Sequence, residues 1–454
     1  MELEHIKEMD KITFKTSIGA FAGNEHEDAY EFLGIPYAKA GRFEYCKRID
    51  TYEDVFDAGK MGNACPQYRQ FYPNLQSRER LFYFNEFRRG LDFSYDEDCL
   101  NLNIYTPKNK TACPVVLFFH GGGFNSGCNA EEPFRGYELA KRGIVSVFAN
   151  YRVGVFGYFS HEAIEKRYGR NGNFGLDDQL NAIHWVKEHI KEFGGDENNI
   201  SIMGQSAGAI SVQYHCLNHE NEGLFNRAVM MSGGGMFPKF SLPKKANETY
   251  DYWHEFMELA GCRSFEEFRN ADLKSIFDAY EAIKQRRKDS INNMMPVIDG
   301  YLLKDSIDQL IKDPLKIDYM IGYTNCDLYA PIMAHIGNRF AYDNGAYVYY
   351  FDIDQPGDDN KAFHSCDLRY MFGRLKTSWR PFRKEDEKVS EQMMDYLCSF
   401  AENGDPNRQG RILWQKTDGK NRKVLCFRLN ETKMGRPSFI KLTMNMLKRG
   451  EPRA

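Results

Sequence analysis

The chain has 454 residues, of which 42% are hydrophobic and 14% aromatic, and its formal net charge is −4. This length and apolar content suffice for a large buried core, and α/β folds of this size often form one domain. Lys and Arg are spread among Asp and Glu and form no basic stripe, which excludes nucleic acid as an expected partner.

The N-terminal sequence MELEHIKEMDKITFK is charged from its second residue and lacks the apolar stretch of a secretory signal. The longest apolar runs, such as VVLFF, are too short to cross a bilayer. The eleven cysteines are an odd number, widely scattered, with no CxxC pair and no Cys/His cluster at metal spacing. We therefore expect a cytoplasmic protein with mostly reduced thiols, no membrane segment, and no metal or other cofactor.

Two β-branched or aromatic runs, around Lys11–Lys15 and Ala29–Phe32, open the chain. Short apolar strands and helical patterns then alternate, with strands at 114–121, 144–151, 200–204, 227–233, 319–323 and 347–351 and helices near 177–192 and after 206. Continuous apolar strands separated by helices predict a mostly parallel, twisted central sheet with helices on both faces. Right-handed crossovers between such strands give a doubly wound α/β architecture.

The pattern between about 237 and 290 becomes helical and charged, with Trp253, Phe256 and Leu259 on one face. A block of this kind between strands indicates either a helical cap insertion or a long crossover. A further helix near 384–402 has the apolar spacing of core packing. Because the chain contains no repeat and no low-complexity linker, we expect residues 1–454 to form a single domain.

Residues Gly204-Gln205-Ser206-Ala207-Gly208 form a G-x-S-x-G motif after an apolar strand and before a helix. This strand–turn–helix context holds a serine on a tight, strained turn, which is tolerated because the two glycines remove side chains that would collide. A plain strand-to-helix turn is the alternative. The motif makes Ser206 the candidate nucleophile.

The segment His120-Gly121-Gly122-Gly123-Phe124 follows another buried strand. Attack on an ester carbonyl places negative charge on its oxygen, and backbone N–H groups approach that oxygen closely where glycine has no side chain. A phosphate loop would require Lys-Ser/Thr after the glycines, which this segment lacks. We assign the N–H groups of Gly122, Gly123 and Ala207 to an oxyanion hole.

A serine hydroxyl becomes a nucleophile when an imidazole takes its proton and a carboxylate orients the imidazole. The histidines that follow Ser206 are His215, His219, His254, His335 and His364. The turn just beyond the last predicted strand favours His364, with His335 as a competitor. Asp327, a few residues after the preceding strand, is the candidate acid, and Asp299 is its rival.

With these motifs the chain resembles the type-B carboxylesterase family, whose members include para-nitrobenzyl esterases, cholinesterases and the cell-adhesion neuroligins. The resemblance runs nearly end to end, over FLGIPYA (32–38), ACPQ (64–67), EDCLNLNIYTP (97–107), HGGGF (120–124), NYRVGVFGYFS (150–160), GNFGLDDQLNAIHWV (172–186), FGGDENNISIMGQSAGA (193–209), PVIDG (296–300), AFHSCDLRYMFG (362–373) and NGDPN (403–407). It implies an α/β-hydrolase fold without cofactor, and it favours His364 over His335. The implied catalytic triad is Ser206, Asp327 and His364, with the oxyanion hole at Gly122, Gly123 and Ala207.

The chain departs from the family pattern at several points. The family usually has Glu at the positions of Asp327 and Gln205, and the missing charge before the nucleophile weakens the case for cationic esters. The stretch between Cys65 and Cys99 contains no tryptophan for a cation–π floor. Secreted relatives often bridge the cysteines at these two positions, whereas we expect a reduced pair here. Only 37 positions separate Asp327 from His364, which predicts a shallower, more open pocket.

The resemblance predicts a serine carboxylesterase that hydrolyses neutral carboxylic esters through an acyl-enzyme intermediate, as a monomer or a homodimer. A non-catalytic, neuroligin-like binding protein is one alternative, but those relatives have lost triad members and carry a transmembrane helix. A lipase is the other alternative. Its apolar lid would have to be segment 81–95, whose interleaved Arg and Glu are more typical of a wall of the site.

Overall fold

The computed structural model describes residues 10–68, 77–234, 243–288, 293–327, 330–438 and 440–444. The N-terminal residues from which we expect no secretory signal therefore lie largely outside the described part of the chain. No helix among the described residues is long and apolar enough to cross a membrane.

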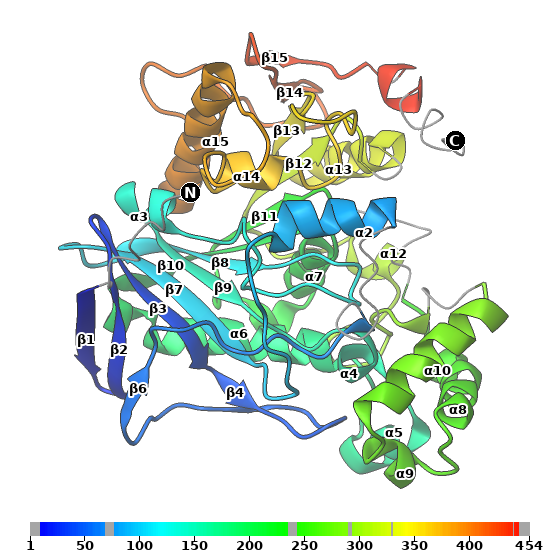
Figure 1. Ribbon diagram of the computed structural model, residues 1–454. Coiled ribbons are helices and arrows are strands. Elements are labelled where there is room, and N and C mark those ends of the chain that lie inside the picture. Colours follow the sequence, from blue (N-terminus) through cyan, green and yellow to red (C-terminus); the bar gives the residue numbers. More distant parts are fainter. Residues whose placement is uncertain are drawn as a thin grey trace.

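One large sheet organises the molecule (Figure 1). Its strands are β1 (Asp10–Thr16), β2 (Gly19–Glu25), β3 (Ala29–Pro36), β6 (Val55–Asp57), β7 (Asn101–Pro107), β8 (Cys113–Phe119), β9 (Val145–Ala149), β10 (Gly195–Gln205), β11 (Arg227–Met231), β12 (Asp318–Thr324), β13 (Tyr347–Phe351), β14 (Val424–Phe427) and β15 (Lys433–Gly435). Their order is β1-β2-β3-β7-β9-β8-β10-β11-β12-β13-β14-β15, and β6 pairs with β2. A separate two-stranded sheet joins β4 (Ala38–Lys39) and β5 (Lys47–Arg48).

The centre of the sheet is parallel and its edges are antiparallel. Every pairing from β9 through β8, β10, β11, β12 and β13 to β14 is parallel. The pairs β1–β2, β2–β3, β3–β7, β7–β9 and β14–β15 are antiparallel. The predicted mostly parallel sheet is therefore confirmed. Strand β7 was not predicted, because Asn101 and Asn103 are buried within it and interrupt the apolar pattern.

The helices lie between and beside these strands. They are α2 (Arg78–Tyr83), α3 (Tyr137–Lys141), α4 (Gly154–Tyr158), α5 (Glu162–Tyr168), α6 (Phe174–His189), α7 (Ala207–Cys216), α8 (Tyr250–Leu259), α9 (Phe265–Arg269), α10 (Leu273–Arg286), α12 (Ile307–Leu310), α13 (Ala330–Asn344), α14 (Asp367–Met371) and α15 (Lys384–Asn403). A π-helix, η1 (Phe84–Arg88), continues α2, and the 3₁₀ turns are η2 (Ile190–Phe193), η3 (His219–Asn221) and η4 (Ala246–Thr249).

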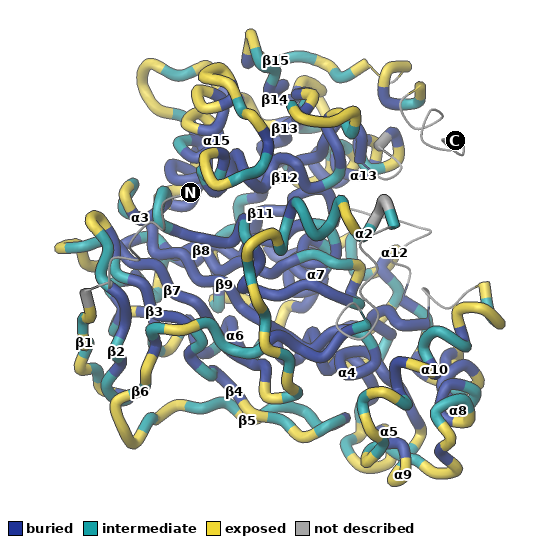
Figure 2. Tube along the Cα trace, viewed as in Figure 1, coloured by how far each residue is buried: buried dark blue, intermediate teal, exposed yellow. Residues whose placement is uncertain are grey.

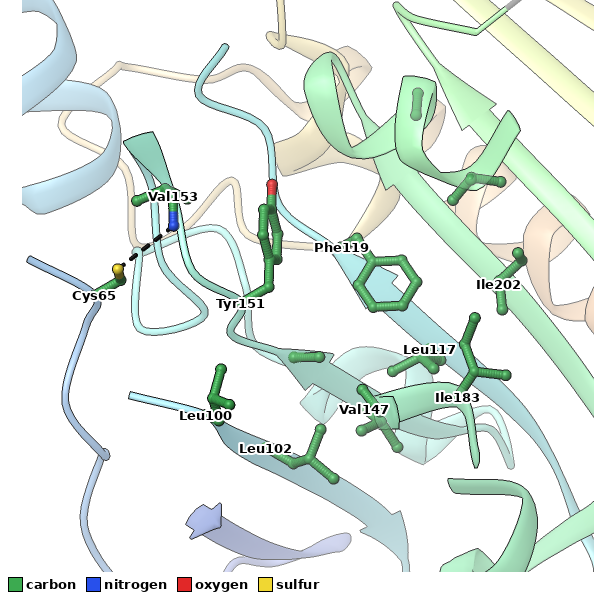
Figure 3. Close-up of a cluster of buried hydrophobic side chains, with 14 of the residues drawn as sticks. Cys65, Leu100, Leu102, Leu117, Phe119, Val147, Tyr151, Val153, Ile183 and Ile202 are labelled. Atoms are coloured by element: carbon green, nitrogen blue, oxygen red, sulfur yellow. Dashed lines mark hydrogen bonds between the residues drawn. The ribbon is translucent and has the colours of Figure 1, made fainter. Parts of the chain in front are cut away.

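Both faces of the sheet are covered, and strand β8 shows how. Successive residues of a strand point to opposite faces. Leu117 and Phe119 pack in one core with Ile183 of α6, which Figure 3 shows in close-up. Val116 and Phe118 pack in a second core with side chains of α3, α14 and α15. Strand β8 is consequently buried except at Pro114, and β10 is buried from Ile200 to its end at Gln205 (Figure 2).

The helical segment predicted near 237–290 contains η4, α8, α9 and α10, while its residues 237–242 and 289–290 lie outside the described part. Trp253 of α8 packs edge-on against Phe159, with ring centroids 5.0 Å apart. Phe268 of α9 stacks on Phe43 at 5.4 Å. These helices therefore form an aromatic contact layer with α5 at one corner of the molecule (Figure 1). Their role as a cap stays a prediction.

Candidate active site

Ser206 lies between the end of β10 and the start of α7, in a conformation that L-residues rarely adopt. Its φ is 55° and its ψ is −122°. The Ser206 N–H donates to the Met231 carbonyl at 2.8 Å, which fixes the turn to the neighbouring strand. A Cβ on Gly204 would lie 2.3 Å from the Gly208 carbonyl carbon, so the turn closes only because glycine stands there. The strain holds the hydroxyl at the carboxyl edge of the sheet, at the N-terminus of a helix.

The loop after β8 turns its carbonyl groups away from the serine. The Gly121 carbonyl lies 2.8 Å from His120 Nδ1, which donates to it. The Gly122 carbonyl accepts the N–H groups of Asn125 and Ser126, each at 3.1 Å. Gly122 has φ 120°, and a Cβ there would lie 1.9 Å from the Ser126 carbonyl oxygen.

Within the described part of the chain, no hydrogen-bond acceptor takes up the N–H groups of the three residues that we predicted as oxyanion donors. These residues are Gly122, Gly123 and Ala207. Ala207 directly follows Ser206 as the first residue of α7, so its N–H belongs to the free donors of a helix start. The arrangement therefore leaves backbone donors available next to the serine, which is what a developing oxyanion needs.

The structure brings Asp327 and His364 together. Asp327 Oδ1 lies 2.7 Å from His364 Nδ1. Asp327 is buried, and its other oxygen, Oδ2, accepts the Ser232 hydroxyl and the Thr324 N–H, both at 2.8 Å. His364 keeps a quarter of its side chain exposed. The carboxylate is thus fixed by three hydrogen bonds, and the imidazole that it orients remains accessible. No motif in the sequence indicates the roles of Ser232 and Thr324.

The rival candidates lie elsewhere. Asp299 Oδ1 accepts the N–H groups of Tyr301 and Leu303, so this carboxyl group closes its own loop. His335 lies on an exposed position of α13.

One contact at the site was not expected. The Gln205 amide nitrogen lies 3.2 Å from His364 Nε2, the ring atom that would have to accept a proton from Ser206. No hydrogen bond joins the Ser206 hydroxyl to His364 among the described residues. From the sequence, Gln205 is notable only because it lacks the negative charge of the Glu that the family usually has at this position.

A second carboxyl group, Asp367 on α14, lies close to the pair. It is fully buried, and Tyr349 donates its hydroxyl to Asp367 Oδ2 at 2.7 Å. Burial, together with the charge of Asp327, raises the pKa of Asp367 to about 7. Below that pH, Asp367 is mostly protonated and adds no full negative charge beside the Asp327–His364 pair.

The segment that we considered as a lipase lid, residues 81–95, contains the end of α2, all of η1 and the residues that follow, and it is tied to the chain around His364. Phe82 packs edge-on against Phe363 with centroids 4.9 Å apart. Glu86 is buried and accepts the Arg380 guanidinium at 2.8 Å and the Trp379 indole N–H at 2.9 Å. Detachment of the segment would separate the buried carboxylate of Glu86 from the Arg380 guanidinium and is therefore disfavoured. The contacts fit a fixed wall of the site.

All eleven cysteines are free thiols, and all but Cys46 are buried. Cys65 Sγ accepts the Val153 N–H at 3.4 Å (Figure 3). The adjacent Cys65 thiol and burial raise the pKa of Cys99 well above its usual range. The pair that secreted relatives often bridge is therefore a pair of neighbouring free thiols in this structure, and the raised pKa of Cys99 disfavours its thiolate.

Three groups in the described ranges gather side chains that could ligate a metal: His161, Glu162 and His254; Cys46, Asp177 and Asp178; and Asp50, Glu188 and His189. In the first group the Ala163 N–H donates to His161 Nδ1, so the neutral ring carries its proton on Nε2, the atom that faces Glu162. Since a metal ligand must offer a lone pair, this arrangement suits a hydrogen-bonded cluster rather than a cation site.

A nucleophile elbow, backbone donors beside it and an acid–imidazole pair, all at the carboxyl edge of a doubly wound sheet, define a hydrolase-type site on an α/β-hydrolase fold. Solved structures agree on the fold. A thermophilic para-nitrobenzyl esterase superposes with a TM-score of 0.80 at 23% identity, covering 95% of this chain and 99% of that one. A second para-nitrobenzyl esterase superposes with a TM-score of 0.79 at 23% identity, over 96% and 99% of the two chains.

Sequence comparison narrows the class. The carboxylesterase family model matches residues 10–340 and 328–439, and the chain belongs to that family. Gut esterase 1 of Caenorhabditis elegans is 32% identical over 86% of this chain and 65% of its own length. Fumonisin B1 esterase of Sphingopyxis macrogoltabida is 31% identical over 78% and 63%. The chain thus spans slightly less than two thirds of these two relatives. Para-nitrobenzyl esterase of Bacillus subtilis is 25% identical over 90% and 93%.

Proposed function

We propose that this chain is a serine carboxylesterase that hydrolyses neutral carboxylic esters through an acyl-enzyme intermediate. The observation that carries the proposal is that Ser206, on its strained elbow, directly follows Gln205, whose amide lies 3.2 Å from His364, while His364 is joined to Asp327 at 2.7 Å. Membership of the carboxylesterase family supports the same reaction.

In the proposed cycle, Ser206 Oγ attacks the ester carbonyl while His364 Nε2 takes its proton, and Asp327 stabilises the imidazolium that forms. The N–H groups of Gly122, Gly123 and Ala207 hold the oxyanion, and the loss of one such donor would cost about 3 kcal/mol. His364 then protonates the departing alcohol. Water, activated by the same imidazole, releases the carboxylic acid and restores the serine. No step requires a cofactor or a metal.

The substrate class follows from the charges around the site. Asp327 is engaged by three hydrogen bonds, Asp367 holds its proton in the acidic range, and residue 205 is an uncharged glutamine. Among these described groups, none offers an unengaged negative charge to a cationic alcohol below about pH 7. We therefore propose small neutral esters as substrates, handled by a cytoplasmic monomer or homodimer that binds neither nucleic acid nor membranes.

The short connection between Asp327 and His364 supports the further proposal of a shallow, open pocket. Its described residues are occupied mainly by one helix, α13, and one strand, β13.

Hydrolysis of p-nitrophenyl esters, from acetate through octanoate, tests the proposal on the wild type beside Ser206→Ala. Turnover in the wild type and its loss in the folded variant are the expected result. A folded wild type without turnover on any of these esters would favour a neuroligin-like binding role. Activation by emulsified triglyceride, with weak turnover of soluble esters, would favour a lipase.

A further inference from the structure

The imidazole of His364 is held at both of its nitrogen atoms. Nδ1 donates to Asp327 Oδ1 at 2.7 Å, which leaves Nε2 as an acceptor in the neutral ring. The group found at Nε2 is the Gln205 carboxamide, with its nitrogen at 3.2 Å. An amide N–H can donate to that lone pair, so the contact has the geometry expected of an imidazole whose proton-accepting atom is engaged by the carboxamide.

The position of the Gln205 side chain is set by its surroundings. Gln205 is the last residue of β10, is 4% exposed, and pairs with Met231 of β11. A Cβ on Gly121 would lie 2.5 Å from Gln205 Oε1, so the amide oxygen rests against the backbone of the oxyanion loop where only glycine leaves room. The carboxamide therefore contacts the oxyanion loop with its oxygen and His364 with its nitrogen.

We propose that Gln205 is a positioning residue of this esterase, which donates to His364 Nε2 and thereby holds the imidazole in its neutral, proton-accepting form beside Ser206. When substrate binds, the serine hydroxyl takes over the lone pair and the carboxamide releases it. This proposal rests on the proposed function, because a proton-accepting histidine matters only if Ser206 attacks a carbonyl carbon.

The chemistry of residue 205 then sets the pH range in which the base is available. A carboxamide donates to the neutral ring and so favours it over the imidazolium. An apolar side chain of the same length, such as Met, cannot donate a hydrogen bond and therefore does not favour the neutral ring. A carboxylate cannot donate at all, and its negative charge favours the imidazolium instead. The midpoint of the histidine titration should therefore rise in the order Gln, Met, Glu.

The ionisable groups that the structure places against His364 come from two other elements. Asp327 follows β12, and Asp367 lies on α14. The thiols of Cys326 and Cys366 lie beside them. All four are unchanged in variants of residue 205, so a difference between variants reports on that residue alone.

The test compares Gln205→Met and Gln205→Glu with the wild type by NMR, using protein that carries ¹³Cε1-labelled histidine. His364→Gln identifies the His364 signal by its disappearance. We expect the titration midpoint to rise by roughly half a pH unit in Gln205→Met and by about one to two pH units in Gln205→Glu. The acidic limb of kcat/KM should move by the same amounts. Gln309→Glu, which adds the same charge at an exposed position of α12, is the control that should leave both unchanged.

The titration needs no substrate, so it separates the two proposals. Midpoints that rise in the expected order support the role of Gln205 even if no ester is turned over. Midpoints that agree within about 0.2 pH units in all three proteins would overturn it, and would leave the ester hydrolysis intact if turnover persists. If Gln205→Glu does not fold, the uncharged Gln205→Met decides the question by itself.

Discussion

Asp327→Asn should remove nearly all activity, and the reason lies in the donors around the carboxylate. Asp327 Oδ2 accepts the Thr324 N–H at 2.8 Å, and a backbone N–H cannot reverse its direction. In the variant, the amide oxygen must face Thr324, which turns the amide NH₂ towards His364. Two donors cannot face each other, so the imidazole has to accept at Nδ1 and carry its proton on Nε2. His364 Nε2, which should take the proton of Ser206, then already carries a proton.

A wrong tautomer of this kind costs about 10⁴-fold in kcat, which corresponds to ~5 kcal/mol of transition-state stabilisation. The assay is steady-state hydrolysis of p-nitrophenyl acetate, with circular dichroism to show that the variant folds. Asp299→Asn is the matched control, because Asp299 is a half-buried acid that accepts two backbone N–H groups but does not contact His364. We expect kcat of that control to stay within a factor of about three of the wild type. A loss below tenfold in Asp327→Asn would refute the tautomer argument.

Three further predictions concern groups that surround the site. Ser232→Ala removes one of three hydrogen bonds to the acid, and urea unfolding should show a loss of about 2 kcal/mol with kcat reduced about tenfold. Glu86→Gln leaves Arg380 buried without one of its carboxylate partners and should cost about 3–5 kcal/mol in the same assay, against less than ~1 kcal/mol for the surface variant Glu138→Gln. Because the pKa of Asp367 is raised to about 7, the folded state binds this proton more tightly than the unfolded state. The wild type should therefore lose ~4 kcal/mol of stability relative to Asp367→Asn as pH rises from about 4 to above 7, and parallel urea profiles would contradict this.

The parts of the site that could be predicted from the sequence are those fixed by neighbours in the chain. The elbow at Ser206 depends on Gly204 and Gly208, and all three belong to one five-residue motif. The parallel sheet was likewise predictable, because each central strand is a continuous apolar run. By contrast, β14 has only four residues, and the pattern of β7 is broken by buried asparagines, so both strands escaped prediction.

The pairings across the fold could not be predicted from residue pattern. Gln205 and His364 are 159 positions apart, and Ser232 and Asp327 are 95 apart. A hydroxyl or amide group has no periodicity that would indicate its partner. The choice of His364 over His335 also depended on resemblance, since either residue follows Ser206 in the required order. The structure separates them physically, because one contacts a buried carboxylate and the other lies on the exposed face of a helix.

The substitution of Asp for the usual Glu and the short segment that follows it both go with a close approach of the chain at Asp327 to the chain at His364. Asp327 Oδ2 accepts the N–H of Thr324, the last residue of β12, so the acid folds back onto the strand that precedes it. The shorter side chain reaches His364 because an isolated β-bridge pairs Cys326 with Phe363. This pairing brings the backbone before Asp327 next to the backbone before His364. The connection between the two residues spans only 37 positions, so it can supply few of the walls of the pocket. The walls of the pocket must then come from elsewhere, and α2 with η1, anchored to Phe363 and Arg380, is the segment in position to supply one of them.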